Sequence, residues 1–324
     1  MFWIQLYHKT IEQEHLFYSL FYYKIIPIHS PQEAGTMKQD THWEDEFRAA
    51  VRQSSVQGIT EILRNAMKAA VLAGKREQTV KHRALLLIED ECSGNPQLLH
   101  PLTDVLANLQ QETAQELAVF LLVSLYPHSP ASAIARLKQL ANSAFKSVRE
   151  WTAHACGTLL SRHFDSFYPE LTQWITDPSP FIRRTALISA KLAAKPGNPA
   201  LAEQLLDLIE PLLYDKHSEI RKQLGAAVIG DGFLRVYPEQ TKRRLEHWIL
   251  LDSPVVRLHI AKLFSSAEAV TQWERIRPLF EQLRSDQNAA VQKAVQSAVH
   301  HLAKRLPSEP LLHITEPVQG SRIS

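Results

Sequence analysis

The sequence contains little glycine and little cysteine, and it lacks the patterns that mark sheets, disulfide frameworks and metal sites. Glycine accounts for only 10 of the 324 residues and cysteine for two, and the regular alternation of valine and isoleucine that marks strands is scarce. Cys92 and Cys156 lie far apart, and neither belongs to a CxxC pair or to a histidine cluster with metal-ligand spacing. We therefore expect a helical protein of the reducing cytoplasm that holds no disulfide, metal ion or other cofactor.

We expect neither a membrane span nor a signal peptide in the N-terminal region. Its longest apolar run, Leu16 to Ile28, includes Lys24 and Pro27 and is too short to cross a bilayer. No positively charged leader precedes the run, and no small-residue cleavage site follows it. Residues 1–36 nevertheless hold eight aromatic residues, in a chain with 6 Trp, 8 Tyr and 12 Phe. Two interpretations stay open: an extension that packs on the first helices, or a segment foreign to the native protein, which would then begin at Met37.

The net charge of the chain is only +2, but it is unevenly distributed. From Ala144 to Arg305 there are 22 Lys and Arg against 17 Asp and Glu, whereas the rest of the chain has 14 against 17. This second part is therefore mildly basic. The excess is compatible with a polyanionic partner such as nucleic acid, and equally with an ordinary solvated helical surface.

A β-branched residue followed by arginine or glutamine recurs at nearly constant spacing in the second half of the chain. The intervals between successive pairs are 34, 38, 36 and 35 residues, a period that is typical of stacked repeats. An aspartate precedes four of the pairs by five or six residues. The pairs are Val148-Arg149, Ile182-Arg183, Ile220-Arg221, Val256-Arg257 and Val291-Gln292, and the aspartates are Asp177, Asp215, Asp252 and Asp286.

When the five segments are aligned on the arginine position, they show one apolar helical stripe. The residues one before, three after and seven after that position are mostly apolar, and a spacing of four places them on one side of a helix. We predict that each segment is the second helix of a helical pair. First helices are predicted at 169–175, 201–213, 238–250 and 273–283, with Pro169 and Pro238 at two of the starts, and degenerate repeats and a cap at 47–72, 79–92, 97–110 and 113–126.

An aspartate followed about six residues later by Val-Arg at the start of a second helix resembles the pattern of the HEAT-repeat family. The resemblance covers roughly residues 95–305. It implies an all-α, right-handed α-solenoid, here a single monomeric array over 37–310 with a flexible tail at 311–324. In that family the aspartate and arginine usually pair as a ladder. The ladder residues implied here are Asp177, Asp215, Asp252, Arg149, Arg221 and Arg257, and Arg183 also occupies a ladder position.

Within this class, one stretch is similar to the AlkD-like DNA alkylation repair proteins. It begins at Tyr168-Pro-Glu, continues through Phe181-Ile-Arg-Arg-Thr-Ala, and ends at Ile220-Arg-Lys-Gln-Leu-Gly. The resemblance implies a protein that holds duplex DNA in the concave groove of the solenoid and releases cationic alkylated purines. It places Arg183 and Arg184 where the family grips DNA, and Trp151 where an aromatic residue lines the lesion cleft.

Two positions depart from the pattern of that family. The aspartate expected four residues after Trp151 is replaced by Ala155, and the tryptophan expected after the glycine of the last string is Ala226. Glu150 and His154 are near Ala155 in sequence, but no spacing rule indicates that either residue replaces the missing aspartate. Because the chemistry requires a carboxylate to stabilise the sugar cation, a glycosylase for alkylated bases would be slow or absent. The sequence therefore assigns no catalytic residue.

A row of charged residues is the main reason to predict double-stranded DNA as the partner. One residue after the ladder position stand Glu150, Arg184, Lys222, Leu258 and Lys293, about 100° around the helix from it. If the second helices line the groove, these cations would track phosphates. The DNA-binding candidates are thus Trp151, Arg183, Arg184, Lys222 and Lys293. The alternative is a protein-interaction scaffold that uses the same groove, because such a scaffold tolerates mixed charge and needs no carboxylate.

Other catalytic arrangements are not predicted. Cys156 falls on the packing stripe, which favours a buried, apolar-like role over a nucleophile. The sequence Gly230-Asp231-Gly232 lacks the strand and lysine of a phosphate loop, and we expect it to loosen or bend a second helix. Lys242-Arg243-Arg244 would lie on the opposite, convex side as a solvated run, and most of the six tryptophans are expected in the core.

Overall fold

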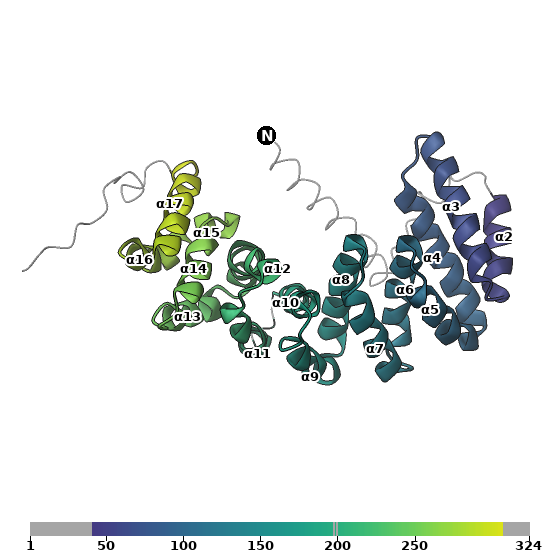
Figure 1. Cartoon of the computed structure of the whole chain (residues 1–324), viewed down its shortest axis with the longest axis horizontal. Coiled ribbons are helices and arrows are strands. Elements are labelled where there is room, and N and C mark those ends of the chain that lie inside the picture. Colours follow the sequence, from purple (N-terminus) through teal and green to yellow (C-terminus); the bar gives the residue numbers. More distant parts are fainter. Residues whose placement is uncertain (1–40, 197, 199, 307–324) are drawn as a thin grey trace, which may run out of the picture. The chain divides into compact units, whose positions relative to one another are not determined.

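A computed structural model describes residues 41–196, 198 and 200–306 (Figure 1). Within these residues the structure is helical, with short 3-10 and π segments and no strand, so the all-α prediction is confirmed. The contacts divide the chain into two compact units, Met1–Leu106 (unit 1) and Ala107–Ser324 (unit 2). The predictions for residues 1–36 and 311–324 fall outside the described residues, and the single array over 37–310 stays a prediction.

Unit 1 contains three helices that pack against one another, α2 (Thr41–Arg52), α3 (Val56–Leu72) and α4 (Glu77–Gly94). They are followed by η1 (Pro96–Leu98) and by α5 (Leu99–Asn108), which crosses the boundary between the two units. The amphipathic stretch predicted over 47–72 is interrupted between α2 and α3. Ser54 has a φ of 50°, and the side chain of Ser55 accepts a hydrogen bond from the backbone N–H of Gly58. This serine caps the N-terminus of α3, and the break lets the apolar stripes of α2 and α3 face each other.

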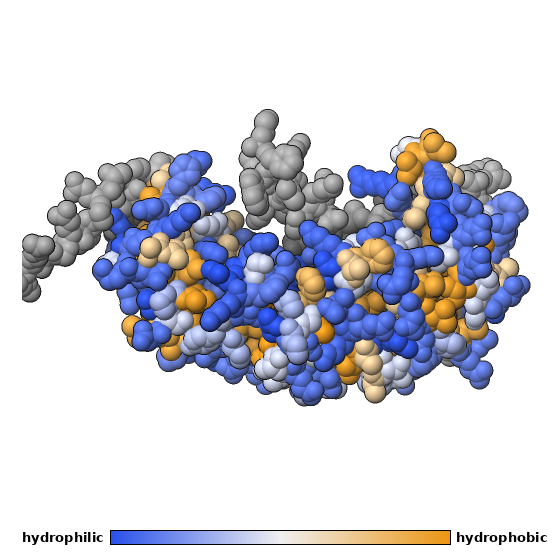
Figure 2. All heavy atoms as spheres, viewed as in Figure 1, coloured by the Kyte–Doolittle hydropathy of each residue, from blue (hydrophilic) through white to orange (hydrophobic). Residues whose placement is uncertain are grey.

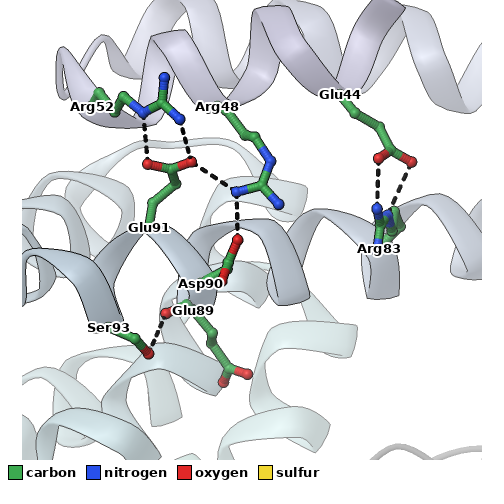
Figure 3. A network of polar contacts seen from close by, with 8 residues as sticks. All are labelled: Glu44, Arg48, Arg52, Arg83, Glu89, Asp90, Glu91 and Ser93. Carbon is green, nitrogen blue, oxygen red and sulfur yellow. Dashed lines mark hydrogen bonds and ion pairs between the residues drawn. The ribbon is translucent and has the colours of Figure 1, made fainter. Parts of the chain in front are cut away.

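Ion pairs tie α2 to α4 (Figure 3). Arg52 donates to the two carboxylate oxygens of Glu91 at 2.7 and 2.9 Å, and Arg48 donates to Glu91 at 2.7 Å. Arg83 on α4 makes a second two-pronged pair with Glu44 on α2, at 2.6 and 2.9 Å. The hydrogen bonds from Arg52 and Arg48 together outweigh burial and hold the pKa of Glu91 below its ordinary value.

Replacing Glu91 by glutamine should make unit 1 less sensitive to acid. Because the folded pKa is depressed, Glu91 contributes stability at neutral pH that is lost as the pH falls from the usual carboxyl pKa of about 4.3 through the lowered value. We expect the urea midpoint of the wild-type protein to fall further between about pH 5 and about pH 3 than that of Glu91→Gln. The matched control is Glu61→Gln, which changes an exposed carboxylate on α3. Equal acid losses in the wild-type protein and Glu91→Gln would contradict the expectation.

Unit 2 is a stack of helical pairs in two layers. The second helices α6, α8, α10, η3, α14 and α17 each pack on the next, and among the first helices α11 packs on α13 and α13 on α16. In Figure 1, α7, α9, α11 and α13 follow one edge of the unit. The first helices are α7 (Pro130–Ala141), α9 (Phe164–Trp174), α11 (Ala200–Ile209) with η2 (Glu210–Tyr214), α13 (Pro238–Trp248) and α16 (Trp273–Arg284); the second helices are α6 (Glu112–Leu125), α8 (Lys146–Arg162), α10 (Pro180–Ala193), α12 (Ser218–Arg221) with η3 (Leu224–Leu234), α14 (Pro254–Leu263) and α17 (Ala289–Ala303), and α15 (Ala267–Thr271) precedes α16.

The apolar stripe predicted from the repeat forms the core between these layers. The residues one before the ladder position are at most 7% exposed, and those three after it at most 4%. Each fully buried aliphatic side chain of this kind stabilises the fold by about 1.5–3 kcal/mol. Val299, seven after the position in α17, is half-buried instead, because α17 is the last helix among the described residues.

The second helix that follows Asp215 is wound differently from the others. Its α-helical part, α12, spans only four residues, and the π-helix η3 follows. Gly230-Asp231-Gly232 lie in this π segment, where the sequence indicated a loosened or bent helix. Gly225 lets η3 approach α14 closely, because a Cβ there would lie 2.7 Å from both the carbonyl oxygen of His259 and the Cβ of Lys262.

One of the two proline-based helix starts is wrong. Pro238 begins α13 as predicted, but α9 begins at Phe164, so Pro169 lies inside that helix. The earlier start is supported by stacking of the Phe164 and Tyr168 rings, whose centroids are 5.0 Å apart, and by Asp165 in the first turn. None of the described helices is both long enough and apolar enough to cross a membrane.

Candidate nucleic-acid interface

Two of the ladder arginines join consecutive repeats in the way the family pattern implies. Arg183 donates from Nε to Oδ2 of Asp215 at 2.6 Å, and its Nη1 donates to the carbonyl oxygens of Asp177 and Pro178 at 2.8 and 3.0 Å. Arg257 pairs with Asp286 at 2.5 Å and donates to a carbonyl of its own turn. Each arginine therefore holds its own turn and the aspartate of the following repeat. Arg183, a DNA-binding candidate from the sequence, is engaged in the ladder.

The other ladder positions differ. Arg149 donates to the carbonyls of Ser143 and Ala144 at 2.6 and 3.0 Å, but its guanidinium lies 4.4 Å from the ring centroid of Phe181. Asp177 pairs instead with Lys138 at 2.8 Å. The side chains of Arg221 and Asp252 make no hydrogen bond or ion pair with any other described residue, and Nε of Arg221 is buried.

Arg184 is buried in an ion-pair bridge rather than exposed to a ligand. It is 7% exposed, and its Nη2 donates to both carboxylate oxygens of Glu150 on α8 at 2.8 Å. Its Nε lies 3.9 Å from a carboxylate oxygen of Glu219 on α12. Because Arg184 sits between two carboxylates, its charge is neutralised within the fold. The structure thus leaves Lys222 and Lys293 as the exposed cations of the predicted row.

Trp151 lies on α8 among other rings. It is half-buried, and its ring centroid lies 5.3 Å from that of Phe120 and 6.3 Å from that of His154. Burial, reinforced by Lys191 and Arg184, lowers the pKa of His154 to about 3, so the imidazole is neutral at physiological pH. Ala155, which occupies the place of the family's aspartate, is fully buried. The carboxylate nearest to Trp151 in sequence, Glu150, is held by Arg184.

Cations on the two layers of unit 2 are paired differently. On the first helix α13, Lys242 pairs with Glu246 at 2.5 Å and Arg243 with Glu203 at 3.3 Å. The neighbouring Arg244 contacts three carboxylates at 2.5–3.0 Å. Several cations on the second helices, Lys146 and Arg162 among them, form no ion pair with any residue that the structure describes, and four of these cations lie from Arg221 to Lys293. We call these four the cation row: Arg221, Lys222, Lys262 and Lys293.

The register of the helices places three members of the cation row, Lys222, Lys262 and Lys293, along one side of the second-helix layer, and Arg221 occupies the adjoining ladder position. Lys222 and Lys293 share the position one after the ladder residue, and Lys262 lies four residues after Leu258, which has that position in α14. Burial and the nearby Arg221 lower the pKa of Lys262. The sequence alignment missed Lys262 because it looked for charge only at the position directly after the ladder residue; extending the row by four residues would have found it.

The described residues of unit 2 contain neither a reactive thiol nor a metal-binding cluster. Cys156 is fully buried, and burial raises the pKa of its thiol, which agrees with the packing role inferred from its place on the stripe. Across the described parts of the chain, no group of three or more histidine, cysteine, aspartate or glutamate side chains is placed to hold a metal ion. The surface in Figure 2 is mostly hydrophilic over unit 2, with separate hydrophobic spots.

These features define a helical-repeat protein whose second helices carry cations without carboxylate partners. Residues 88–230 match the family model described as DNA alkylation repair enzyme. The segment that holds Trp151, Arg184, Arg221 and Lys222 is therefore a DNA alkylation repair domain, and the resemblance inferred from the sequence is confirmed. The match ends before α13 and does not include Lys262 or Lys293.

No curated protein matches the chain. Among solved structures, a designed armadillo repeat protein is 18% identical and matches 62% of this chain and 99% of its own, with a TM-score of 0.29. A second designed armadillo repeat protein, solved in complex with the peptide (KR)4, is 17% identical over 79% of this chain and 99% of its own, with a TM-score of 0.34. An engineered protein is 15% identical over 82% of this chain and 76% of its own, with a TM-score of 0.31.

Proposed function

We propose that this protein binds duplex DNA through the second-helix side of unit 2 and does not excise alkylated bases. The observation that carries the proposal is the contrast in pairing. The charged groups of α13 are neutralised by carboxylates at 2.5–3.3 Å, whereas the cation row has no such partner among the described residues. Cations without carboxylate partners can exchange their counterions for DNA phosphates, and the released counterions favour binding. The match of residues 88–230 to the repair family supports DNA as the polyanion.

The site around Trp151 lacks the group that base excision needs. Departure of an alkylated purine leaves positive charge on the sugar, and a carboxylate aimed at that charge supplies the main stabilisation. Ala155 supplies none, and Glu150 has both of its carboxylate oxygens on Arg184. Releasing Glu150 would leave the buried Arg184 guanidinium without its closest partner, which is energetically costly. DNA binding without excision follows.

Incubation with methylated duplex DNA tests both halves of this proposal. We expect the protein to retain the duplex in a mobility-shift assay at low salt, and abasic sites to stay at the level of the buffer control. Glu150→Gln is the informative variant, because it removes the only acidic side chain adjacent to Trp151 in sequence. Abasic product from the wild-type protein that disappears in Glu150→Gln would assign catalysis to Glu150 and overturn the second half. Absence of duplex retention would favour a protein-binding scaffold.

A further inference from the structure

Arg221 is the ladder arginine that bonds to neither of the expected partners. Arg183 and Arg257 each reach the aspartate of the following repeat and a carbonyl of their own turn. The corresponding aspartate for Arg221 is Asp252, which is exposed, and no hydrogen bond between them is formed. The switch from α12 to the π-helix η3 directly after Arg221 changes the winding at this rung. At this rung, Nε of Arg221 is buried without a hydrogen-bond partner among the described residues.

A second group without a partner lies on the neighbouring helix. His259 on α14 is fully buried, and both of its ring nitrogens lack a hydrogen-bond partner within the described part of the chain. The charged groups that act on it are Lys262 and Arg221, together with Asp215, whose carboxylate is engaged by Arg183 and by the backbone N–H of His217. A buried imidazole with two unsatisfied nitrogens costs free energy that a bound hydrogen-bonding group would recover.

The close contact between η3 and α14 brings together the two helical segments that carry these groups. The position of a Cβ on Gly225 is 2.7 Å from the Cβ of Lys262 and 2.7 Å from the carbonyl oxygen of His259. Arg221 lies one turn before Gly225. Burial lowers the pKa of Lys262, and the positive charge of Arg221 lowers it further. Two like charges are therefore held near each other, and neither forms an ion pair with a described carboxylate, an unfavourable arrangement that an anion would relieve.

We propose that Arg221, Lys262 and His259 bind one oxyanion, a phosphate group. The Arg221 guanidinium and the Lys262 ammonium would supply charge, and a ring N–H of His259 would donate a hydrogen bond to the oxyanion. Arg221 and Lys262 are half-buried, so the anion approaches from their side and reaches the imidazole beneath. The site lies partly outside residues 88–230. As a contact to a DNA phosphate it rests on the proposed function, and free inorganic phosphate offers the same chemistry.

The test compares Arg221→Gln with Arg243→Gln, which removes the same charge from α13. We expect Arg221→Gln to weaken duplex binding by about tenfold or more, as loss of a charge-assisted hydrogen bond does, and to reduce the salt slope by about one. Arg243→Gln should leave both unchanged. Arg221 makes no hydrogen bond to other described residues, so the variant should keep the wild-type thermal midpoint; Lys262→Gln is a second variant with the same expected effect.

A direct readout of His259 separates the two sources of phosphate. Its ring proton resonance is assigned by its loss in His259→Asn and followed as inorganic phosphate is added. A shift that is absent in Arg221→Gln supports a site for free phosphate, whereas a loss of duplex affinity without such a shift assigns the contact to the DNA backbone. One combination of results would overturn the oxyanion site and leave the proposed function standing. In it, wild-type duplex binding depends steeply on salt, Arg221→Gln binds the duplex as tightly as Arg243→Gln does, and added phosphate does not shift the His259 resonance. If the wild-type protein does not bind duplex DNA, the proposed function fails and the phosphate shift alone decides the site.

Discussion

Replacement of Lys222, Lys262 and Lys293 together by glutamine is expected to weaken duplex binding by about two to three orders of magnitude near 0.1 M salt. Each of these cations would neutralise about one phosphate, and each neutralised phosphate contributes about 0.9 to the salt slope. The three residues form no ion pair with other described residues, so the substitution removes ligand contacts without breaking internal ones. Fluorescence anisotropy of a labelled duplex, titrated at several salt concentrations, measures both the affinity and the slope.

The matched control neutralises three cations on the other layer. Replacing Lys242, Arg243 and Arg244 by glutamine changes the net charge by the same amount, but these side chains already contact carboxylates on the first-helix side. We expect the control to keep nearly all of the duplex affinity. Equal losses in the two triple variants would show that net charge, rather than the cation row, determines binding.

The largest expected effect on stability comes from Trp248, and Trp248→Ala should lower the free energy of unfolding by about 3–5 kcal/mol. The side chain is fully buried in α13, and its Nε1–H donates to Oε2 of Glu210 in η2 at 2.9 Å. Glu210 also accepts from Arg244 at 3.0 Å. Truncation would therefore leave a large cavity and also remove a contact between consecutive first helices. Urea unfolding followed by circular dichroism measures the loss.

Two variants separate the contributions at this position. Trp248→Phe keeps most of the buried apolar surface and loses the hydrogen bond, so its cost should be smaller than that of Trp248→Ala. Leu250→Ala changes a side chain that is 73% exposed, and its effect should stay within about 0.5 kcal/mol of the wild-type protein. A loss in Trp248→Ala no greater than that in Leu250→Ala would contradict the role assigned to Trp248.

Helical periodicity in the sequence was sufficient for the fold of unit 2 because each repeat buries the same stripe. Ile182, Ile220 and Val256 occupy equivalent positions in consecutive second helices and are all buried. Local signals were less reliable at helix starts. Pro169 has the sequence context of a first-turn proline, yet stacking of Phe164 on Tyr168 and the acidic first turn begin the helix earlier. Tertiary and local packing thus outweighed the preference of one residue.

The pairing of charged residues could not be predicted in the same way. Arg184 shares the register of Lys222 and Lys293, but Glu150 stands 34 residues earlier in the chain at the same height of the neighbouring helix. Whether such a pair closes depends on the offset between adjacent repeats, which sequence spacing does not contain. In the same way, the spacing of the repeats did not reveal that the ladder closes at Arg183 and Arg257 but not at Arg221, which is followed by the π-helix η3.

We infer that the second-helix side of unit 2 binds the phosphates of duplex DNA. The most direct test is the affinity of the wild-type protein for a short duplex measured between about 50 and about 200 mM salt. The four cations of the cation row lead us to expect a plot of log K against log salt with a slope of about −3 to −4. A flat plot, or no measurable affinity at the lowest salt, would contradict the claim.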